Sequence, residues 1–145
     1  MNIVGAFEKA FSDKEKNNWD KIYVLVDVHD TIMQGTHKEG DYLWYSQALD
    51  VLKEMSDMND ICLILWTGSH KETIETIISK LREQGICFDY INENPEVGDT
   101  NFYCSSGKLY FNVGIDDRFG FDVERDWDAI GQYLIFKKRL NKTWF

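Results

Sequence analysis

The sequence has little of several features that mark particular classes of protein. It contains one proline and three cysteines, and no C-x-x-C spacing that would indicate a zinc site. Three cysteines cannot all pair with one another, so we expect reduced thiols in a cytoplasmic protein. The N-terminus lacks a basic segment and a small-residue cleavage site, so it does not resemble a signal peptide. No apolar run approaches the roughly 20 residues of a membrane span, and we expect no contact with a membrane.

Positive charge is also scarce. The chain has 16 lysines and arginines against 25 acidic residues, which gives a net charge of −9. This balance weighs against a broad nucleic-acid-binding surface, because such surfaces depend on basic side chains that meet phosphates. It leaves room for a small, local phosphate pocket. Apolar residues, by contrast, make up 43% of the 145 residues, which is enough to bury the core of one domain.

Apolar residues alternate along the chain between the spacing of strands and that of helices. Continuous apolar runs predict strands at residues 22–26, 61–67, 86–91 and 109–115. Helical spacing predicts amphipathic helices near residues 3–11, 44–55 and 69–85. Ser69 and Glu72 form a capping-box pattern for the last of these helices. After the fourth strand, the pattern predicts a short helical turn at 129–133 and a short final strand at 133–136.

Strands that alternate with helices predict an α/β fold. We expect a single three-layer domain, residues 1–145, with a mostly parallel, Rossmann-like sheet. Residues 1–18 would be an N-terminal helical extension and residues 21–136 the catalytic core. The segment 32–42 is too short for an inserted cap domain, and residues 92–107 are typical of a loop.

In such sheets, ligands bind beyond the carboxyl ends of the strands. The polar residues at these positions are therefore the candidate site. They are Asp27, His29, Asp30 and Thr31 after the first strand, Thr67, Gly68 and Ser69 after the second, and Lys108 before and Asp116, Asp117 and Arg118 after the fourth.

These residue types together point to phosphoryl transfer. Several carboxylates at one edge of a sheet repel one another unless a cation lies among them. Oxygen ligands favour Mg²⁺, which also shares its ligand shell with phosphate. A carboxylate nucleophile, a metal, a hydroxyl group and a lysine suit a reaction in which catalysis consists mostly of positioning and charge neutralisation.

The same residues carry a family resemblance. The stretch Asp27-Val28-His29-Asp30-Thr31 resembles the D-x-D-x-T first motif of the haloacid dehalogenase-like superfamily. Thr67 resembles the hydroxyl residue of its second motif and Lys108 the lysine of its third. The stretch "GIDDR", residues 114–118, resembles the acidic pair of its fourth motif. The resemblance extends from about residue 21 to residue 136. Within the superfamily, the chain is most similar to short members that lack a cap domain.

The resemblance implies a role for each residue. Asp27 would be the nucleophile that forms an aspartyl-phosphate. The carboxylates of Asp27, Asp116 and Asp117 and the backbone carbonyl of His29 would bind Mg²⁺. Thr67 and Lys108 would orient the phosphoryl oxygens and neutralise their charge. Apart from the resemblance, we expect Gly68 and Arg118 to contact the phosphate of a phosphorylated substrate, because they lie next to the other candidate residues at the strand ends.

The sequence departs from the family pattern at His29. Most phosphatases of this superfamily have an aspartate there, which acts as the general acid and base. An imidazole can take the same role near neutral pH, and His29 lies two residues from Asp27, so both side chains point the same way. His29 could instead be a structural histidine bonded to Asp30 or to a loop carbonyl.

Other readings of the sequence stay open. A scaffold without activity that binds a phosphorylated ligand or partner would keep the same carboxylates. A signalling receiver domain is less favoured, because its acidic pair follows the first strand. A dinucleotide-binding domain is not supported, because no G-x-G-x-x-G follows the first strand.

Several single residues also have more than one interpretation. Lys71 competes with Lys108 as the lysine of the site. Asp117 could ligate the metal directly, act through water or brace Arg118. The aromatic residues Trp66, Trp127 and Tyr110 are expected to serve in core or loop packing and not as a stacking platform for substrate.

Overall fold

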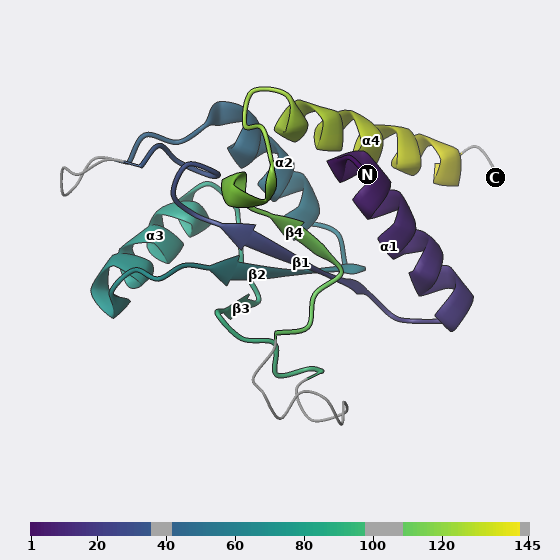
Figure 1. Ribbon diagram of the computed structural model, residues 1–145, viewed down its shortest axis with the longest axis horizontal. Helices are drawn as coiled ribbons and strands as arrows, with labels where there is room; N and C mark the ends of the chain where they lie inside the picture. The colour runs from purple at the N-terminus through teal and green to yellow at the C-terminus, as the bar shows by residue number, and fades with distance from the viewer. Residues whose placement is uncertain (36–41, 98–108, 143–145) are drawn as a thin grey trace.

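The computed structural model describes residues 1–35, 42–97 and 109–142. The helices are α1 (Ile3–Asn17), α2 (Ser46–Ser56), α3 (Lys71–Glu83) and α4 (Asp126–Lys142), with a short 3-10 helix, η2 (Asp117–Phe119). The strands are β1 (Ile22–Asp27), β2 (Ile61–Trp66), β3 (Tyr90–Ile91) and β4 (Val113–Ile115). Figure 1 shows their arrangement.

The four strands form one sheet in the order β3-β2-β1-β4, and every neighbouring pair is parallel. In β1 and β2 the register runs from Ile22 opposite Ile61 to Asp27 opposite Trp66. All four strands therefore end at the same edge of the sheet. This arrangement confirms the predicted α/β fold with a parallel, Rossmann-like sheet.

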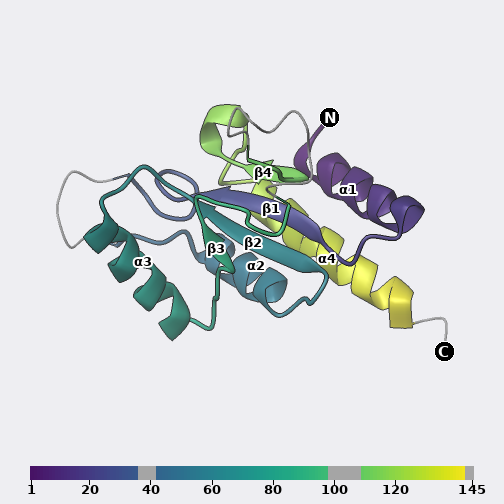
Figure 2. The same ribbon diagram turned by 90° about the horizontal axis from the view of Figure 1, so that it is seen from below.

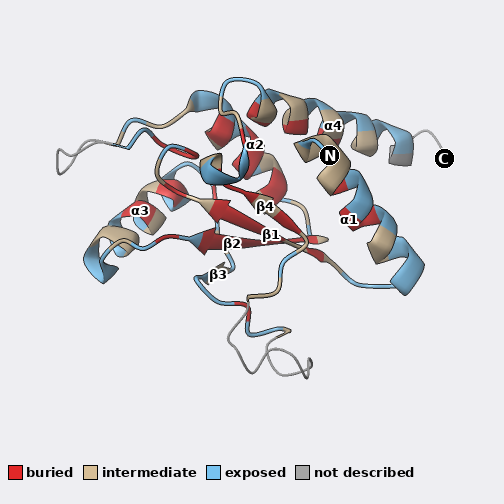
Figure 3. Cartoon of the chain, viewed as in Figure 1, coloured by how far each residue is buried: buried red, intermediate tan, exposed pale blue. Residues whose placement is uncertain are grey.

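The main core lies on one face of the sheet. Val24 and Val26 of β1 and Leu63 and Leu65 of β2 point to this face, where all four helices contribute buried residues to one cluster. Helix α1 belongs to this cluster through Phe7, which is fully buried. Helices α2 and α4 pack side by side above the sheet in Figure 1, and Figure 2 shows the same layers from below. In Figure 3 the buried residues are concentrated on the strands and on parts of the helices.

The opposite face of the sheet carries a smaller cluster of Leu25, Cys62 and Ile64. Tyr23, Tyr90 and Leu109 pack against it. Among the described residues, irregular segments on either side of residues 98–108 lie over this face, in place of a helix.

Strands β3 and β4 are shorter than the sequence predicts, because polar side chains take over part of the pairing. Asp89 donates its backbone N–H to the Leu63 carbonyl, while its carboxylate accepts from the Leu63 N–H at 2.8 Å. Asn112 repeats this arrangement with Tyr23. A side-chain oxygen in place of a backbone carbonyl satisfies the same donor, so the regular ladder begins only after these residues.

The predicted final strand at 133–136 is wrong. These residues belong to α4, whose Trp127, Ile130 and Leu134 are fully buried at helical spacing. A short apolar run cannot by itself distinguish a strand from a helix turn. The other predicted helices are present as α1, α2 and α3. Among the described residues, no helix combines the length and the apolar character needed to cross a membrane.

Candidate functional site

The end of β1 turns sharply and brings several polar groups together. The carbonyl of the buried Val28 accepts the backbone N–H groups of Thr31, Ile32 and Met33 at 2.9–3.3 Å. Asp30 has φ 60°, a left-handed conformation that aspartate tolerates better than most residues, and its carboxylate accepts from the Gly35 N–H at 2.8 Å. This turn keeps residues 27–31 at the carboxyl edge of the sheet.

The buried hydroxyl of Thr31 links the first strand to the fourth. Its oxygen lies 3.2 Å from Asp27 Oδ2 and 3.4 Å from Asp117 Oδ1, and it accepts the Asp117 backbone N–H at 3.2 Å. A hydroxyl has one proton and can donate it to only one carboxylate at a time. Thr31 therefore fixes the positions of both carboxylates but cannot satisfy both.

Asp116 follows β4 and begins the 3-10 helix η2. It is buried, with 8% of its surface exposed, and its Oδ1 accepts the Arg118 backbone N–H at 2.9 Å as the N-cap. Its place at the start of η2 fixes the carboxylate beside β1, because β4 pairs with that strand.

The three carboxylates form one cluster. One oxygen each from Asp27, Asp116 and Asp117 lies within 4.8 Å of the others. Burial, and then the charge of Asp116, raise the pKa of Asp27 to about 6. Two negative charges at such distances repel by about 3–4 kcal/mol at an effective dielectric constant near 20. The cluster therefore favours either a proton or a cation among its oxygens.

The second strand contributes hydroxyl groups and backbone amides. The Thr67 backbone is held by Asn92, whose side chain accepts the Thr67 N–H and donates to the Thr67 carbonyl, both at 2.8 Å. The Thr67 hydroxyl lies 2.9 Å from the Ser69 hydroxyl and accepts the Ser69 N–H at 3.2 Å. The loop 67–69 thus places two hydroxyl groups on the side of β1 opposite Asp116, while the Thr67 and Ser69 backbone N–H groups are bonded within the protein.

These groups line a single pocket of about 510 Å³ at the carboxyl edge of the sheet. Its lining residues are Asp27, His29, Asp30, Trp66, Thr67, Gly68, Ser69, Asp116, Asp117 and Arg118. Four of them are aspartates, and Arg118 is the one lysine or arginine among the described residues of the lining. Electrostatically, the pocket therefore suits a cation together with an anionic ligand better than an anion alone.

The structure brings together most of the residues predicted for the site. Asp27, His29, Thr67, Gly68, Asp116, Asp117 and Arg118 all line the pocket. Lys108 lies outside the described residues. Lys71, its competitor, opens α3 and is not among the described lining residues.

Two interpretations of single residues were wrong. Ser69 does not cap α3, because the N-cap is His70, which makes no side-chain cap hydrogen bond; the Ser69 hydroxyl instead contacts Thr67. Trp66 is 41% exposed and lines the pocket, so it is not a core residue. Trp127 is fully buried and donates its indole N–H to the Thr31 carbonyl at 2.8 Å, as expected of a packing residue.

The signals for Ser69 and Trp66 were present but ambiguous. A serine three residues after a strand fits both a capping box and a site loop. The last residue of a buried strand can be covered or open, and the sequence does not say which. Asp27 and Trp66 are register partners, and this becomes visible only when β1 and β2 are paired.

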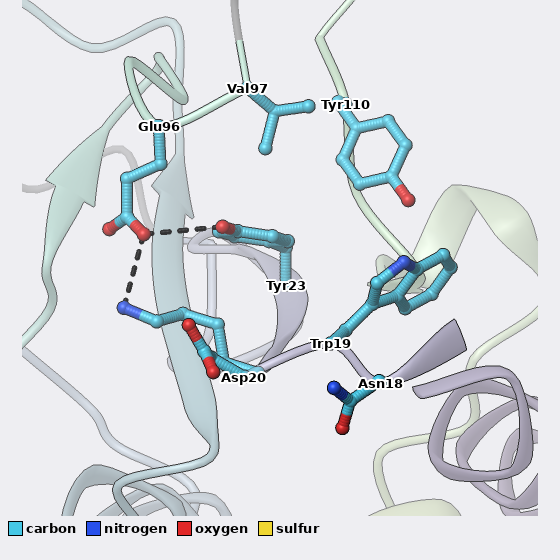
Figure 4. Close-up of a pocket in the computed structure, with 8 residues that line it drawn as sticks. Asn18, Trp19, Asp20, Tyr23, Glu96, Val97 and Tyr110 are labelled. Atoms are coloured by element: carbon cyan, nitrogen blue, oxygen red, sulfur yellow. Dashed lines mark hydrogen bonds and ion pairs between the residues drawn. The ribbon is translucent and has the colours of Figure 1, made fainter. Parts of the chain in front are cut away.

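A second pocket, of about 550 Å³, lies near the start of β1 and away from the carboxylate cluster (Figure 4). Its wall includes Trp19, Tyr23 and Tyr110. Beside them, Glu96 accepts a hydrogen bond from the Tyr23 hydroxyl at 3.2 Å and pairs with the Lys21 ammonium at 3.1 Å. The carboxylate of Glu96 thus already has partners from the protein itself.

Comparison with known proteins supports the fold. The chain is 27% identical to a solved conserved protein from Bacteroides thetaiotaomicron, over 82% of this chain and 92% of that chain, with a TM-score of 0.60. No protein-family model and no curated protein matches the chain.

Proposed function

We propose that the protein is a Mg²⁺-dependent phosphohydrolase that acts through an aspartyl-phosphate on Asp27. The observation that carries this proposal is the cluster of Asp27, Asp116 and Asp117 at the carboxyl edge of the parallel sheet, within 4.8 Å of one another. Thr67 and Arg118 also line this pocket, whose residues carry charges of both signs. We further propose that the chain belongs to the haloacid dehalogenase-like superfamily, which the order of these residues along the chain supports.

The donor set fits Mg²⁺. Asp27, Asp116 and Asp117 offer hard carboxylate oxygens, which Mg²⁺ prefers, and the backbone carbonyl of His29 would add a fourth oxygen ligand. Burial, and then the charge of Asp116, raise the pKa of Asp27, and a bound cation would oppose this shift. When bound, the metal would neutralise the carboxylates and the phosphoryl oxygens and keep Asp27 ionised.

The side chains of the pocket have distinct roles in this reaction. A carboxylate oxygen of Asp27 attacks phosphorus, and the bond from phosphorus to the alcohol oxygen of the substrate breaks. His29 gives its proton to the departing oxygen, so that an alcohol leaves. His29 then takes a proton from water, which attacks the phosphorus and releases phosphate and the free Asp27 carboxylate.

The remaining residues position the phosphoryl group. Thr67, Gly68 and Arg118 line the same pocket as the acidic cluster. They would bind phosphoryl oxygens and orient phosphorus toward Asp27. Lys108 is proposed for the same task on the basis of the family resemblance.

The proposed substrate is an accessible phosphomonoester, such as a nucleotide, a nucleic-acid end or another larger molecule. In the described residues the pocket opens at the sheet edge without an inserted cap, which supports a substrate that need not be enclosed. A cytoplasmic location is part of the proposal, and the unpaired thiols of Cys62 and Cys87 are compatible with it.

A second candidate function is binding of a phosphorylated ligand without hydrolysis. The observation that favours it is His29, which replaces the acid–base aspartate of most phosphatases of this superfamily. The binder would keep the metal and the phosphate contacts and would lack efficient protonation of the leaving group.

A hydrolysis screen separates the two functions. The purified protein is incubated with a panel of phosphomonoesters, including nucleotides and end-phosphorylated oligonucleotides, in Mg²⁺ and in chelator. The phosphohydrolase releases phosphate only in Mg²⁺. No release from any substrate, together with Mg²⁺-dependent binding of the same compounds, would instead support the binder.

A further inference from the structure

Trp66 is exposed where its strand is otherwise buried. The first five residues of β2 are buried, and the last, Trp66, is 41% exposed. A tryptophan that leaves this much ring in water forgoes part of the hydrophobic stabilisation that its size offers. Trp66 is also one of the residues that line the candidate site, so part of its exposed surface borders the place where a ligand would bind.

Its position relative to the nucleophile is fixed by the sheet. Trp66 is the register partner of Asp27 on the neighbouring parallel strand. Side chains of paired residues in adjacent strands point to the same face. The Trp66 side chain therefore leaves the sheet on the same face as the Asp27 side chain, one strand away.

The other described residues that line the pocket include no second large apolar side chain. The neighbouring Gly68 has no side chain to cover Trp66. The pocket of about 510 Å³ is within the range of sites for small organic ligands and exceeds what a phosphate group alone needs.

We infer that Trp66 stacks on a flat aromatic group of the substrate, attached within a few bonds of its phosphate. This inference rests on the proposed function of the same site. It narrows the substrate class to phosphomonoesters with a nucleobase or an aryl ring near the phosphate. Stacking on a tryptophan ring does not depend strongly on which aromatic ring stacks there. The experiment therefore has to distinguish a nucleobase from an aryl ring.

Two pairs of substrates isolate the flat ring. Adenosine 5′-monophosphate and ribose 5-phosphate differ by the base. Benzyl phosphate and cyclohexylmethyl phosphate have rings of similar size, but only one ring is flat. Within each pair the phosphate is attached to a primary carbon, so the ratio of kcat/KM values reports recognition of the ring.

The variants are Trp66→Leu, Trp66→Phe and Trp19→Leu. Trp19 is a matched control, because it is 37% exposed but lines the other pocket, beside the start of β1 (Figure 4). Thermal melts accompany the kinetics and report whether each variant is folded.

We expect the wild-type protein to prefer the flat member of at least one pair. Trp66→Leu should reduce this ratio about 10- to 100-fold, Trp66→Phe should keep part of it, and Trp19→Leu should leave it unchanged. A preference confined to adenosine 5′-monophosphate identifies the nucleobase, and one confined to benzyl phosphate identifies a small aryl ring. If Trp66→Leu fails to fold, Trp66→Phe and Trp66→His, read by the same ratio, decide the question.

Equal ratios in the wild type and Trp66→Leu would overturn the stacking role. Failure of the proposed function is a separate result, in which no substrate is hydrolysed by the wild type. In that case the same four compounds are titrated calorimetrically with Mg²⁺ present. Tighter binding of the flat members, lost in Trp66→Leu, supports stacking, and equal or undetectable binding of all four overturns it.

Discussion

The two ends of β1 place carboxylates in opposite situations. At the amino-terminal end, Glu96 meets the ammonium of Lys21 and the hydroxyl groups of Tyr23 and Tyr90. Hydrogen bonding from Tyr90, followed by contacts with Lys21, lowers the pKa of Glu96. At the carboxyl end, burial and the charge of Asp116 raise the pKa of Asp27 to about 6.

This difference supports a structural role for Glu96 and agrees with the proposed role of Asp27 in the active site. Glu96 is satisfied by the protein and stabilises the segment that lies over the second face of the sheet. Asp27 has the shared hydroxyl of Thr31, a backbone hydrogen bond from Val28 and two carboxylate neighbours, so we expect a proton or a bound cation to stabilise it. Substitutions at the two ends should therefore have different consequences.

The largest expected effect is the loss of turnover in Asp27→Asn. An amide is a poor nucleophile, so kcat should fall by about 10³-fold or more, while the melting temperature stays equal or rises because one repelling charge is gone. Steady-state phosphate release and a thermal melt measure this. Glu96→Gln is the control, with turnover within about twofold of the wild type. Similar turnover in Asp27→Asn and the wild type would place the chemistry on another group.

His29→Ala should have the next largest effect, and it should depend on the leaving group. A positioned general acid contributes about 10²–10⁴ in rate, and alkyl phosphates need that proton. Activated aryl phosphates leave without it and should be affected much less. His29→Asp, which restores the usual residue of the superfamily, should retain turnover of the alkyl substrates. Equal losses for both types of substrate would show that the imidazole is not the acid.

Mg²⁺ should stabilise the fold by a smaller amount. A ligand that binds only the folded state at 100 times its Kd contributes about 2.7 kcal/mol, and each kcal/mol corresponds to about 3 °C for a domain of this size. The melting temperature of metal-free protein should therefore rise by several degrees in saturating Mg²⁺. Asp116→Asn should reduce the rise and Glu96→Gln should not. An equal rise in all three proteins would indicate binding elsewhere.

The smallest effect is expected at Glu96. Glu96→Gln removes a charge-assisted interaction near the surface and should destabilise the fold by about 1 kcal/mol at neutral pH. Because the folded pKa lies below the ordinary value of 4.5, this contribution is present above pH 4.5 and is lost as pH falls through the folded pKa. Melts of the wild type and the variant should therefore converge well below pH 4.5. A difference that persists at low pH would mean that packing, and not charge, is responsible.

The parts of the molecule that the sequence predicts are those with strong periodicity. Strands β1 and β2 are continuous apolar runs, and α2 buries Ala48, Val51, Leu52 and Met55 as its spacing indicates. The carboxyl ends of parallel strands meet at one edge, so Asp27, Asp116 and Thr67 could be assigned to one pocket without coordinates.

The parts that were missed depend on tertiary contacts. The run 133–136 is apolar enough for a strand. It is helical because Leu134 lies at helical spacing from Trp127 and Ile130, and all three are buried. The lengths of β3 and β4 depend on side-chain hydrogen bonds of Asp89 and Asn112. The exposure of Trp66 depends on which other segments cover the end of β2. The sequence around Trp66 does not predict this.

The most direct measurement of the central claim is the binding of beryllium fluoride, an acyl-phosphate mimic, followed by ¹⁹F NMR. The mimic requires the Asp27 carboxylate and the neighbouring cation at the same time. A bound resonance should appear in the wild type and in Glu96→Gln when Mg²⁺ is added, and it should be absent in chelator and in Asp27→Asn. A wild-type protein without a bound resonance in saturating Mg²⁺, or an unchanged resonance in Asp27→Asn, would contradict the assignment of Asp27 as the nucleophile of a metal-dependent phosphoryl-transfer site.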